Sequence, residues 1–315
     1  MKVNRDNYNF SGMAAVDYEI FDGLKLTLQG AYVNNLQNYN YFQKYIKYNE
    51  NKESDPSQLD ERFYKWDRTN YNKNFGKHNI KGLLGWHTEK YNYKYQKAVR
   101  KKFPNNELTD MNAGDASTQS NEGYTAELAM ISWFARINYD FAGKYLLEAN
   151  IRADASSRFA EGHRWGYFPS FSGAWRISEE PFMESIRDRV DNLKLRASWG
   201  KLGNQNIGSS YYPTTQQLST GSISMGGNLY TTSAVTSLSN RDLTWETSTM
   251  TDLGIDLSLF GCINITADWY RKITDGILMK LDIPNHIGMG APFQNAGKVR
   301  NQGWELSVGY SKKLT

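Results

Sequence analysis

The chain has 315 residues and a net charge of +4, with charged residues making up 22% of the sequence. Lys and Arg are scattered among nearly as many carboxylates, which excludes a basic patch for binding nucleic acid. The mean hydropathy of -0.67 and the lack of any apolar run of roughly 18 residues exclude membrane-spanning helices.

Alternation of apolar and polar residues with a period of two is the main signal along the chain, and it predicts β-strands with one apolar face. The most regular segments, in chain order, are 24–32, 145–152, 193–199, 252–259, 263–269 and 304–310. In the second of these, Tyr145, Leu147 and Ile151 alternate with polar residues that include Glu148 and Arg152. With the less regular segments, of which 62–75 is the weakest, the sequence predicts about 11 strands.

Short turns and long polar connections alternate between these segments. Short turns with a glycine follow Ile20, Phe75, Phe141 and Phe260. The long connections are expected at about 34–62, 96–122, 155–165, 204–241 and 276–300. One connection on the short-turn side, from Glu179 to Asp191, is longer and is expected to hold a helical turn. Bacterial outer-membrane barrels have this asymmetry, with tight turns on one side and long loops on the other.

Aromatic residues gather at both ends of the predicted strands. Those at the short turns are Phe21, Phe75, Phe141 and Phe260. Those in the outer portions are Trp86, Trp199, Trp245, Trp269 and Trp304. Two aromatic belts are expected where a barrel crosses two membrane interfaces, although aromatic residues are common in any strand.

The alternating pattern fits two architectures, because a soluble β-sandwich also has one apolar and one polar strand face. The lopsided connections favour an all-β, antiparallel transmembrane barrel of an outer membrane. The alternative is a soluble β-sandwich glycan-binding module with long recognition loops. A third hypothesis, an exported glycosidase, needs two converging carboxylates. The adjacent Glu179 and Glu180 would point to opposite faces of a strand and would form a poor pair.

Several features predict that residues 1–315 are one part of a larger barrel domain. Single-chain bacterial barrels have an even number of strands and must close, so about 11 strands are an incomplete set. The N-terminal sequence MKVNRD lacks the apolar core of a signal peptide, and the chain stops abruptly at 312–315. We therefore expect a partial barrel without its signal peptide and C-terminal strands.

An ordered set of short motifs runs through the second half of the chain. The motifs are RADASSRF (152–159), RWGYFPS (164–170), WRISEEPF (175–182), LRASWG (195–200), GN (203–204), LTWE (243–246), GID (254–256), DWYRK (268–272) and NAGKVRNQGWE (295–305). This set closely resembles the C-terminal barrel region of SusC/RagA-type TonB-dependent transporters of Bacteroidota. The resemblance covers residues 145–310 well, and the first third has weaker motifs.

The resemblance implies a barrel of roughly 22 strands in the cell outer membrane, surrounded by its lipids, with an N-terminal plug domain inside. It implies import of oligomeric nutrients, oligosaccharides or peptides, energised by TonB and assisted by a SusD-like surface lipoprotein. We expect this chain to depart from the pattern in three places, lacking a plug domain, a TonB-contacting segment and a final strand that ends in an aromatic residue. TonB would act through the N-terminal region of the parent protein, and no cofactor is implied.

Two groups of residues are candidates for functional contacts. Loop residues whose rings could stack on a substrate, or could instead anchor the loops or a lipoprotein, are Tyr211, Tyr212, Tyr230 and Phe293. Residues expected to face the lumen and the plug are Arg152, Asp154, Arg158, Glu246, Asp256 and Glu305. The simpler interpretation is that such charges only satisfy one another, with Arg158 paired to a carboxylate such as Asp154.

The sequence gives little support for catalysis or metal binding. The four histidines, which are dispersed and lack metal-ligand spacing, are His78, His87, His163 and His286. No nucleophile motif or phosphate-binding loop is present. We therefore expect a protein that is not an enzyme.

Overall fold

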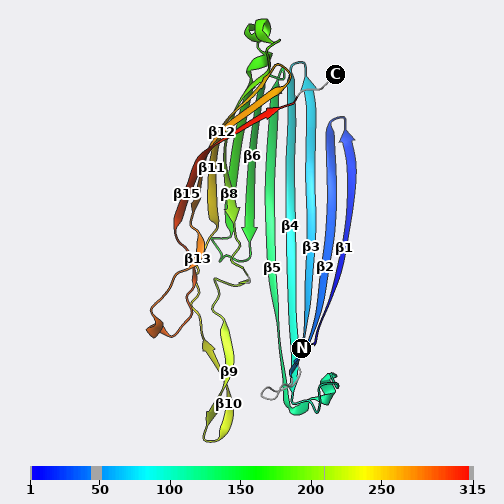
Figure 1. The fold of residues 1–315 in the computed structure, drawn as a ribbon, viewed down its shortest axis with the longest axis vertical. Coiled ribbons are helices and arrows are strands. Elements are labelled where there is room, and N and C mark those ends of the chain that lie inside the picture. Colours follow the sequence, from blue (N-terminus) through cyan, green and yellow to red (C-terminus); the bar gives the residue numbers. More distant parts are fainter. Residues whose placement is uncertain (1, 44–51, 209, 312–315) are drawn as a thin grey trace. The chain divides into compact units, whose positions relative to one another are not determined.

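The computed structural model describes residues 2–43, 52–208 and 210–311, and its regular structure is almost entirely antiparallel β-strand (Figure 1). The long strands are β1 (Lys2–Phe21), β2 (Leu24–Gln43), β3 (Lys52–Phe75), β4 (His78–Lys101), β5 (Asp115–Phe141), β6 (Tyr145–Ser156), β7 (Trp165–Arg176), β8 (Val190–Asn204), β11 (Glu246–Leu259), β12 (Ile263–Asp275) and β15 (Lys298–Tyr310). The short strands are β9 (Leu218–Met225), β10 (Asn228–Val235), β13 (Leu278–Lys280) and β14 (Phe293–Asn295). The 3-10 helices are η1 (Met111–Ala113), η2 (Ile177–Glu179), η3 (Pro181–Ile186) and η4 (Asn285–Ile287).

The long strands form an 11-stranded sheet in the order β1-β2-β3-β4-β5-β6-β7-β8-β11-β12-β15. The strand numbers missing from this order belong to two small ribbons, β9–β10 and β13–β14. These ribbons are inserted in the connections after β8 and β12. Each strand therefore pairs with the long strands before and after it, as in a series of hairpins. The prediction of about 11 antiparallel strands is confirmed.

The chain divides into two compact units, and the strands β1 to β5 contribute residues to both. The first comprises Met1–Val16, Leu28–Trp66 and His87–Met130, and the second comprises Asp17–Thr27, Asp67–Trp86 and Ile131–Thr315. The second unit contains the short turns between β1 and β5 and all of β6 to β15. Every residue of the candidate site lies in this second unit.

The short turns follow from local backbone chemistry. Ala142 and Gly143 have φ values of 56° and 67°, and Phe260 and Gly261 have values of 56° and 63°. Two successive positive φ values define the type I′ turn, which matches the twist of antiparallel strands. The turns close with hydrogen bonds from Lys144 N to Phe141 O (2.9 Å) and from Cys262 N to Leu259 O (3.1 Å).

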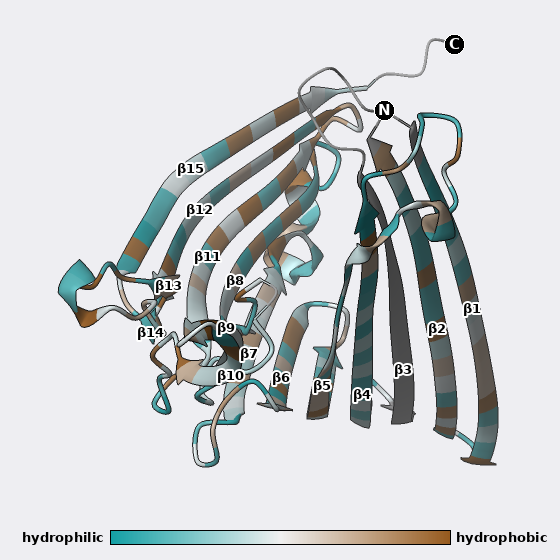
Figure 2. Cartoon of the chain, turned by 90° about the horizontal axis from the view of Figure 1, so that it is seen from below, coloured by the Kyte–Doolittle hydropathy of each residue, from teal (hydrophilic) through white to brown (hydrophobic). Residues whose placement is uncertain are grey.

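The strands of the second unit have an exposed apolar face, defined by residues such as Leu147, Leu195, Ile255, Trp304 and Leu306. Trp304 and Leu306 are 81% and 72% exposed, and bands of apolar and polar residues alternate along β11, β12 and β15 (Figure 2). The opposite strand face carries the charged residues and is called the polar face here. A soluble sandwich would bury its apolar face between two sheets, so the structure contradicts the alternative architecture.

Connections of very different length lie at the two ends of the strands in the second unit. In Figure 1, the β9–β10 ribbon and the connection around β13 extend from the lower strand ends, whereas η3 lies beyond the upper ends. The helical turn expected between Glu179 and Asp191 is present as η2 and η3. No helix among the described residues has both the length and the apolar character to span a membrane.

Two predicted connections are shorter than expected. The connection predicted at 34–62 is strand as far as Gln43 and from Lys52 onward, and residues 44–51 lie outside the described residues. The connection predicted at 96–122 is shorter in the structure, because β4 continues to Lys101 and β5 begins at Asp115. The abrupt chain end at 312–315 also lies outside the described residues.

Candidate functional site

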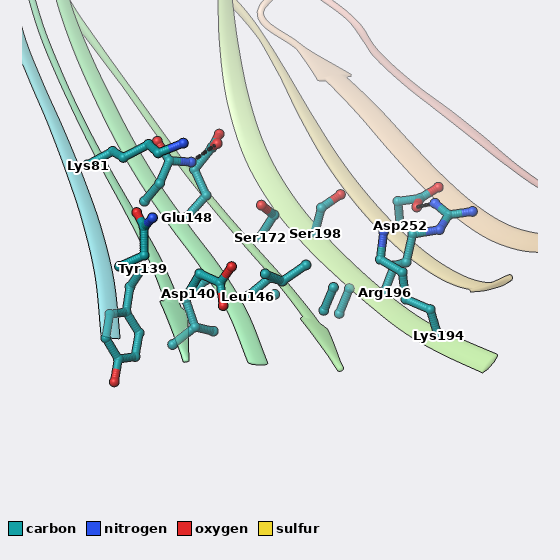
Figure 3. A pocket seen from close by; sticks show the side chains of 16 residues that line it. Lys81, Tyr139, Asp140, Leu146, Glu148, Ser172, Lys194, Arg196, Ser198 and Asp252 are labelled. Carbon is teal, nitrogen blue, oxygen red and sulfur yellow. Dashed lines mark hydrogen bonds and ion pairs between the residues drawn. The ribbon is translucent and has the colours of Figure 1, made fainter. Parts of the chain in front are cut away.

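The polar face of the second unit is hollowed over β7 and β8. The cavity measures about 620 Å³. Its middle is lined by small residues of these strands: Ser172, Gly173, Ala174, Ala197 and Ser198. Figure 3 shows Lys81 and Glu148 on one side of these small residues, and Arg196 and Asp252 on the other. Small side chains leave this part of the face unfilled, so it can receive another segment of protein or a ligand.

Arg196 is the centre of the charged group on one side of the cavity. Its Nε and Nη2 donate to the two carboxylate oxygens of Asp256 at 3.0 and 3.1 Å. Nη2 also donates to Asp268 at 2.8 Å, and Nη1 lies 3.8 Å from an oxygen of Asp252. Strand register places Arg196, Gly254 and Asp268 in one row across β8, β11 and β12. The guanidinium passes over Gly254, where a Cβ atom would lie 2.7 Å from Arg196 Cζ.

Two further charged groups of the polar face, Glu148 and the Arg152–Asp154 pair, also have near neighbours as partners. Glu148 accepts hydrogen bonds from Asn150 Nδ2 at 2.7 Å and from Asn138 Nδ2. Arg152 Nε donates to the two oxygens of Asp154 at 2.7 and 2.8 Å. These groups therefore satisfy one another, as the simpler interpretation holds. The Asn138–Glu148 bond joins two adjacent strands, and the Arg152–Asp154 pair joins two residues on the same face of β6.

Arg158 lies apart from that face, under the loops, and it is only 8% exposed. Its Nη1 donates to the carbonyl oxygen of Gln205 at 3.1 Å, and its Cζ lies 5.8 Å from the ring centre of Tyr211. The predicted pairing of Arg158 with Asp154 is wrong, because Arg152 occupies that carboxylate. Burial lowers the pKa of the Arg158 guanidinium.

A small buried core fixes the loops at this end of the strands. Phe159 and Leu243 are almost completely buried, and the ring of Trp245 lies 5.3 Å from Phe159 and 5.4 Å from Phe168. Trp245 Nε1 donates to the carbonyl oxygen of Arg164 at 2.8 Å. The prediction of Trp245 in an outer aromatic belt is therefore wrong, since its ring is enclosed by loop residues.

Three other indoles lie on the apolar face, but Trp269 and Trp304 are each the seventh of 13 residues in their strands rather than near an outer end. Trp199 stacks with Phe171 at 6.1 Å between ring centres, and Trp269 lies 6.5 Å from Trp304, all on the apolar face. These pairs come from directly opposed positions of neighbouring strands. Indole rings prefer the boundary between hydrocarbon and water, and the outer aromatic belt stays a prediction.

Side-chain amides join the loop after β8 to the loop after β12. Asn295 Oδ1 accepts a hydrogen bond from Thr244 N at 2.9 Å, and its Nδ2 donates to Thr244 O at 2.8 Å and Gly276 O at 3.0 Å. Glu246 accepts a hydrogen bond from Leu278 N at 3.1 Å. The residue predicted to face the lumen, Glu246, thus helps to fasten a loop. These bonds, with those of Asn240 and Gly290 below, are called the loop frame.

Two further contacts complete the loop frame. Asn240 Nδ2 donates to Phe293 O at 3.0 Å, and Gly290 N donates to Thr236 O at 2.8 Å. A parallel bridge between Ser237 and Gly290 joins the same two loops through their main chains. The loops therefore form one continuous surface at this end of the second unit.

Of the four aromatic residues predicted to contact substrate, Tyr212 and Phe293 come together. They line a cleft of about 70 Å³ between residues 210–217, 237–238 and 280–293. Tyr230 lies on the β9–β10 ribbon, where it is 51% exposed, and Tyr211 lies beside Arg158. Substrate contact by these residues stays a prediction.

Two predicted lumen residues differ in their surroundings. Asp256 is held by Arg196, as described above. Glu305 is exposed and lies directly opposite Asp268 in the β12–β15 register. A contact with a plug domain stays a prediction for both.

At the short-turn side, Glu180 fastens the η2–η3 segment to the ends of β6 and β7. It accepts hydrogen bonds from Tyr145 Oη at 2.7 Å, Lys144 Nζ at 3.0 Å and Trp175 Nε1 at 3.1 Å. The hydrogen bond from Tyr145, followed by those from Lys144 and Trp175, lowers the pKa of the Glu180 carboxyl below its usual range.

Sequence reasoning missed the roles of Glu180, Gly254 and Lys280, whose ammonium lies over Phe293 as described below. The partners of Glu180 at 144 and 145 are distant in sequence, and the row through Gly254 requires the strand register. The pairing of Arg196 with Asp256 had a usable signal, because both lie on the polar face of regular strand segments. Among the described residues, no cluster of His, Cys, Asp and Glu could hold a metal ion.

An antiparallel sheet with an exposed apolar face and a charged opposite face is typical of the wall of an outer-membrane β-barrel. Residues 2–315 match the family model described as "TonB dependent receptor-like, beta-barrel". The chain belongs to this family, whose place is the outer membrane.

Relatives of known name agree with this assignment. TonB-dependent receptor P39 of Formosa agariphila is 38% identical over 242 residues, which is 76% of this chain and 23% of that protein. TonB-dependent receptor SusC of Bacteroides thetaiotaomicron is 34% identical over 62% of this chain and 20% of its own length. The chain thus spans about a quarter or less of these two relatives.

Solved structures show the same fold. The RagAB peptide importer in its closed-closed state superposes with a TM-score of 0.86, at 22% identity, over 99% of this chain and 35% of that chain. A second structure, of the RagAB peptide transporter, gives a TM-score of 0.84 at 23% identity over 96% of this chain and 34% of that chain. The predicted resemblance to SusC/RagA-type transporter barrels is confirmed.

Proposed function

We propose that this chain forms part of the barrel wall of a transporter that imports oligomeric nutrients, glycans or peptides, across the outer membrane. The observation that carries the proposal is the pairing of an exposed apolar strand face with a charged, hollowed polar face in a TonB-dependent receptor family member. One face suits lipid, and the other suits a water-filled lumen. The polar face binds and positions other groups, and we assign it no catalytic step.

The proposal includes the partners of the complete protein. TonB would supply energy through an N-terminal region, and a SusD-like surface lipoprotein would cover the loop end and help to retain substrate. Support comes from the relative named SusC and from the fold shared with RagA of the RagAB peptide importer. The loop frame presents a connected surface at the end where such a lipoprotein and a substrate would arrive.

Uptake in the native host tests this proposal. Cells lacking the gene for the complete protein would be given fluorescently labelled mixtures of oligosaccharides and of oligopeptides, with gene-complemented cells as the control. We expect loss of internalised label for at least one mixture, and the same loss when a proton uncoupler removes the energy that TonB transmits. Equal uptake of both mixtures by deleted and complemented cells would reject the import function.

A further inference from the structure

The cleft between the two joined loops contains one charged group, the ammonium of Lys280. Lys280 and Phe293 are paired across the β13–β14 ribbon, and Lys280 Nζ lies 5.0 Å from the centre of the Phe293 ring. The side chain is exposed, so its ammonium is accessible at the cleft. A cation held against an aromatic face gains some stabilisation there, and its remaining N–H donors are free for another partner.

The surroundings of Lys280 lack a counter-ion. Within the part of the chain that the structure describes, no carboxylate lies within ion-pair distance of its ammonium. The other wall of the cleft is formed by residues within 210–217 and by 237–238. The sequence from 202 to 240 contains no charged side chain, although charged residues make up 22% of the chain. This wall instead offers neutral polar groups, including those of Thr215, Gln217 and Ser237.

The size of the cleft limits what it can hold. A volume of about 70 Å³ is well below the roughly 300 Å³ of the smallest ordinary ligand pockets. The cleft is too small for a whole sugar ring or amino-acid residue. It is large enough for a single functional group attached to a larger molecule, with the rest of that molecule lying outside.

A carboxylate fits these constraints better than a neutral group. Covering the Lys280 ammonium with a hydroxyl or amide would remove water from a charge without supplying an opposite charge, which is unfavourable. A carboxylate would accept a charge-assisted hydrogen bond from the ammonium, and the neutral groups of the opposite wall could donate to its other oxygen. The loop frame keeps both walls in place, so little ordering is needed on binding.

We propose that this cleft is a substrate subsite that accepts a carboxylate of the imported oligomer, with Lys280 as the group that recognises it. The inference rests on the proposed import function and makes it more specific. The carboxylate could belong to a uronic acid of a glycan or to a peptide. The subsite lies at the loop end, so it would select substrate at the entrance to the barrel.

Binding to the complete transporter in detergent micelles, measured by titration calorimetry, tests the inference with two matched pairs of probes. One pair is trigalacturonate and its methyl ester, and the other is triglutamate and triglutamine. We expect at least one acid to bind about tenfold more tightly than its neutral counterpart, and the responding pair identifies the source of the carboxylate. In K280M this ratio should fall below about twofold, and K280R should restore most of it.

The matched control is K298M, because Lys298 lies at the same strand end but its ammonium is paired with Asp275 at 2.7 Å. Its acid-to-neutral ratios should equal those of the unmodified protein. Failure of the wild-type transporter to prefer either acid, or a preference that survives in K280M, overturns the subsite. Loss of nutrient uptake is a separate readout: if the deletion strain imports normally, the import function fails whatever the calorimetry gives.

Discussion

Because Arg196 crosses over Gly254, we predict that Gly254→Ala destabilises the protein. A glycine inside a strand normally costs about 0.5–1 kcal/mol relative to alanine, so this change alone would stabilise the protein. Here the added Cβ would lie 2.7 Å from Arg196 Cζ and would also meet the Asp268 carboxylate. The guanidinium must then release Asp268, and a hydrogen bond to a charged group contributes about 1.5–3 kcal/mol. We expect a net destabilisation of about 1–2 kcal/mol.

Guanidinium unfolding of the complete transporter in micelles, followed by tryptophan fluorescence, measures this change. Gly309→Ala is the control, because its Cβ would have only a backbone oxygen at 3.9 Å as a neighbour on a strand of the same sheet. The control should be neutral or slightly stabilising. In an Asp268→Ala background, the cost of Gly254→Ala should shrink, because the bond that it breaks is already absent. A Gly254→Ala protein as stable as the Gly309→Ala protein would refute the reasoning.

Three further predictions concern the loops, the short turns and the apolar face. Asn295→Asp keeps the acceptor for Thr244 N but loses the two hydrogen bonds that the Asn295 amide donates. Amide hydrogen exchange in residues 276–297 should therefore accelerate at least severalfold. Unchanged exchange would contradict the role given to the loop frame. The lowered pKa of Glu180 means that the stabilisation from its hydrogen bonds is fully present above the ordinary pKa of a glutamate and is lost as the pH falls through the lowered pKa. Exchange in residues 177–189 should therefore rise on acidification, and Glu180→Gln should abolish that dependence. Ile255→Arg places a charge on the apolar face and should cost up to about 2–4 kcal/mol in the unfolding assay, whereas Ser258→Arg on the polar face should cost little.

Most of the fold could be predicted because its determinants are local. The period-two pattern and the glycine turns follow from the pleat and from backbone φ values, which adjacent residues decide. The pattern was weak in the last part of β2, NNLQNYNYFQ, where asparagine and glutamine outnumber the apolar residues, although Phe42 is buried against Phe103 with 5.2 Å between ring centres. There the strand is held by cross-strand contacts such as Gln37 Nε2 to Asn7 Oδ1 at 2.7 Å. Because this portion has few apolar residues, it leaves little alternation to detect.

The candidate site was less predictable, because its contacts join residues that the sequence does not align. The choice of Arg152 over Arg158 as the partner of Asp154 depends on the bend of the chain after β6, which buries Arg158 under Tyr211. The position of Lys280 over Phe293 depends on the pairing of two three-residue strands across a loop. The sequence located the loops that form the cleft, but its lining required three-dimensional coordinates.

The loop frame separates the residues that hold the loops together from the residues that line the cleft. The frame holds main-chain atoms, among them Phe293 O, Thr244 N and Leu278 N, and its side-chain members are Asn240, Glu246 and Asn295. Residues that contribute only main-chain atoms to the loop frame can be replaced without breaking its hydrogen bonds. Substitution of Phe293 or Lys280 would therefore change the proposed subsite and leave the hydrogen bonds of the loop frame in place, whereas the three frame residues bear the structural constraint.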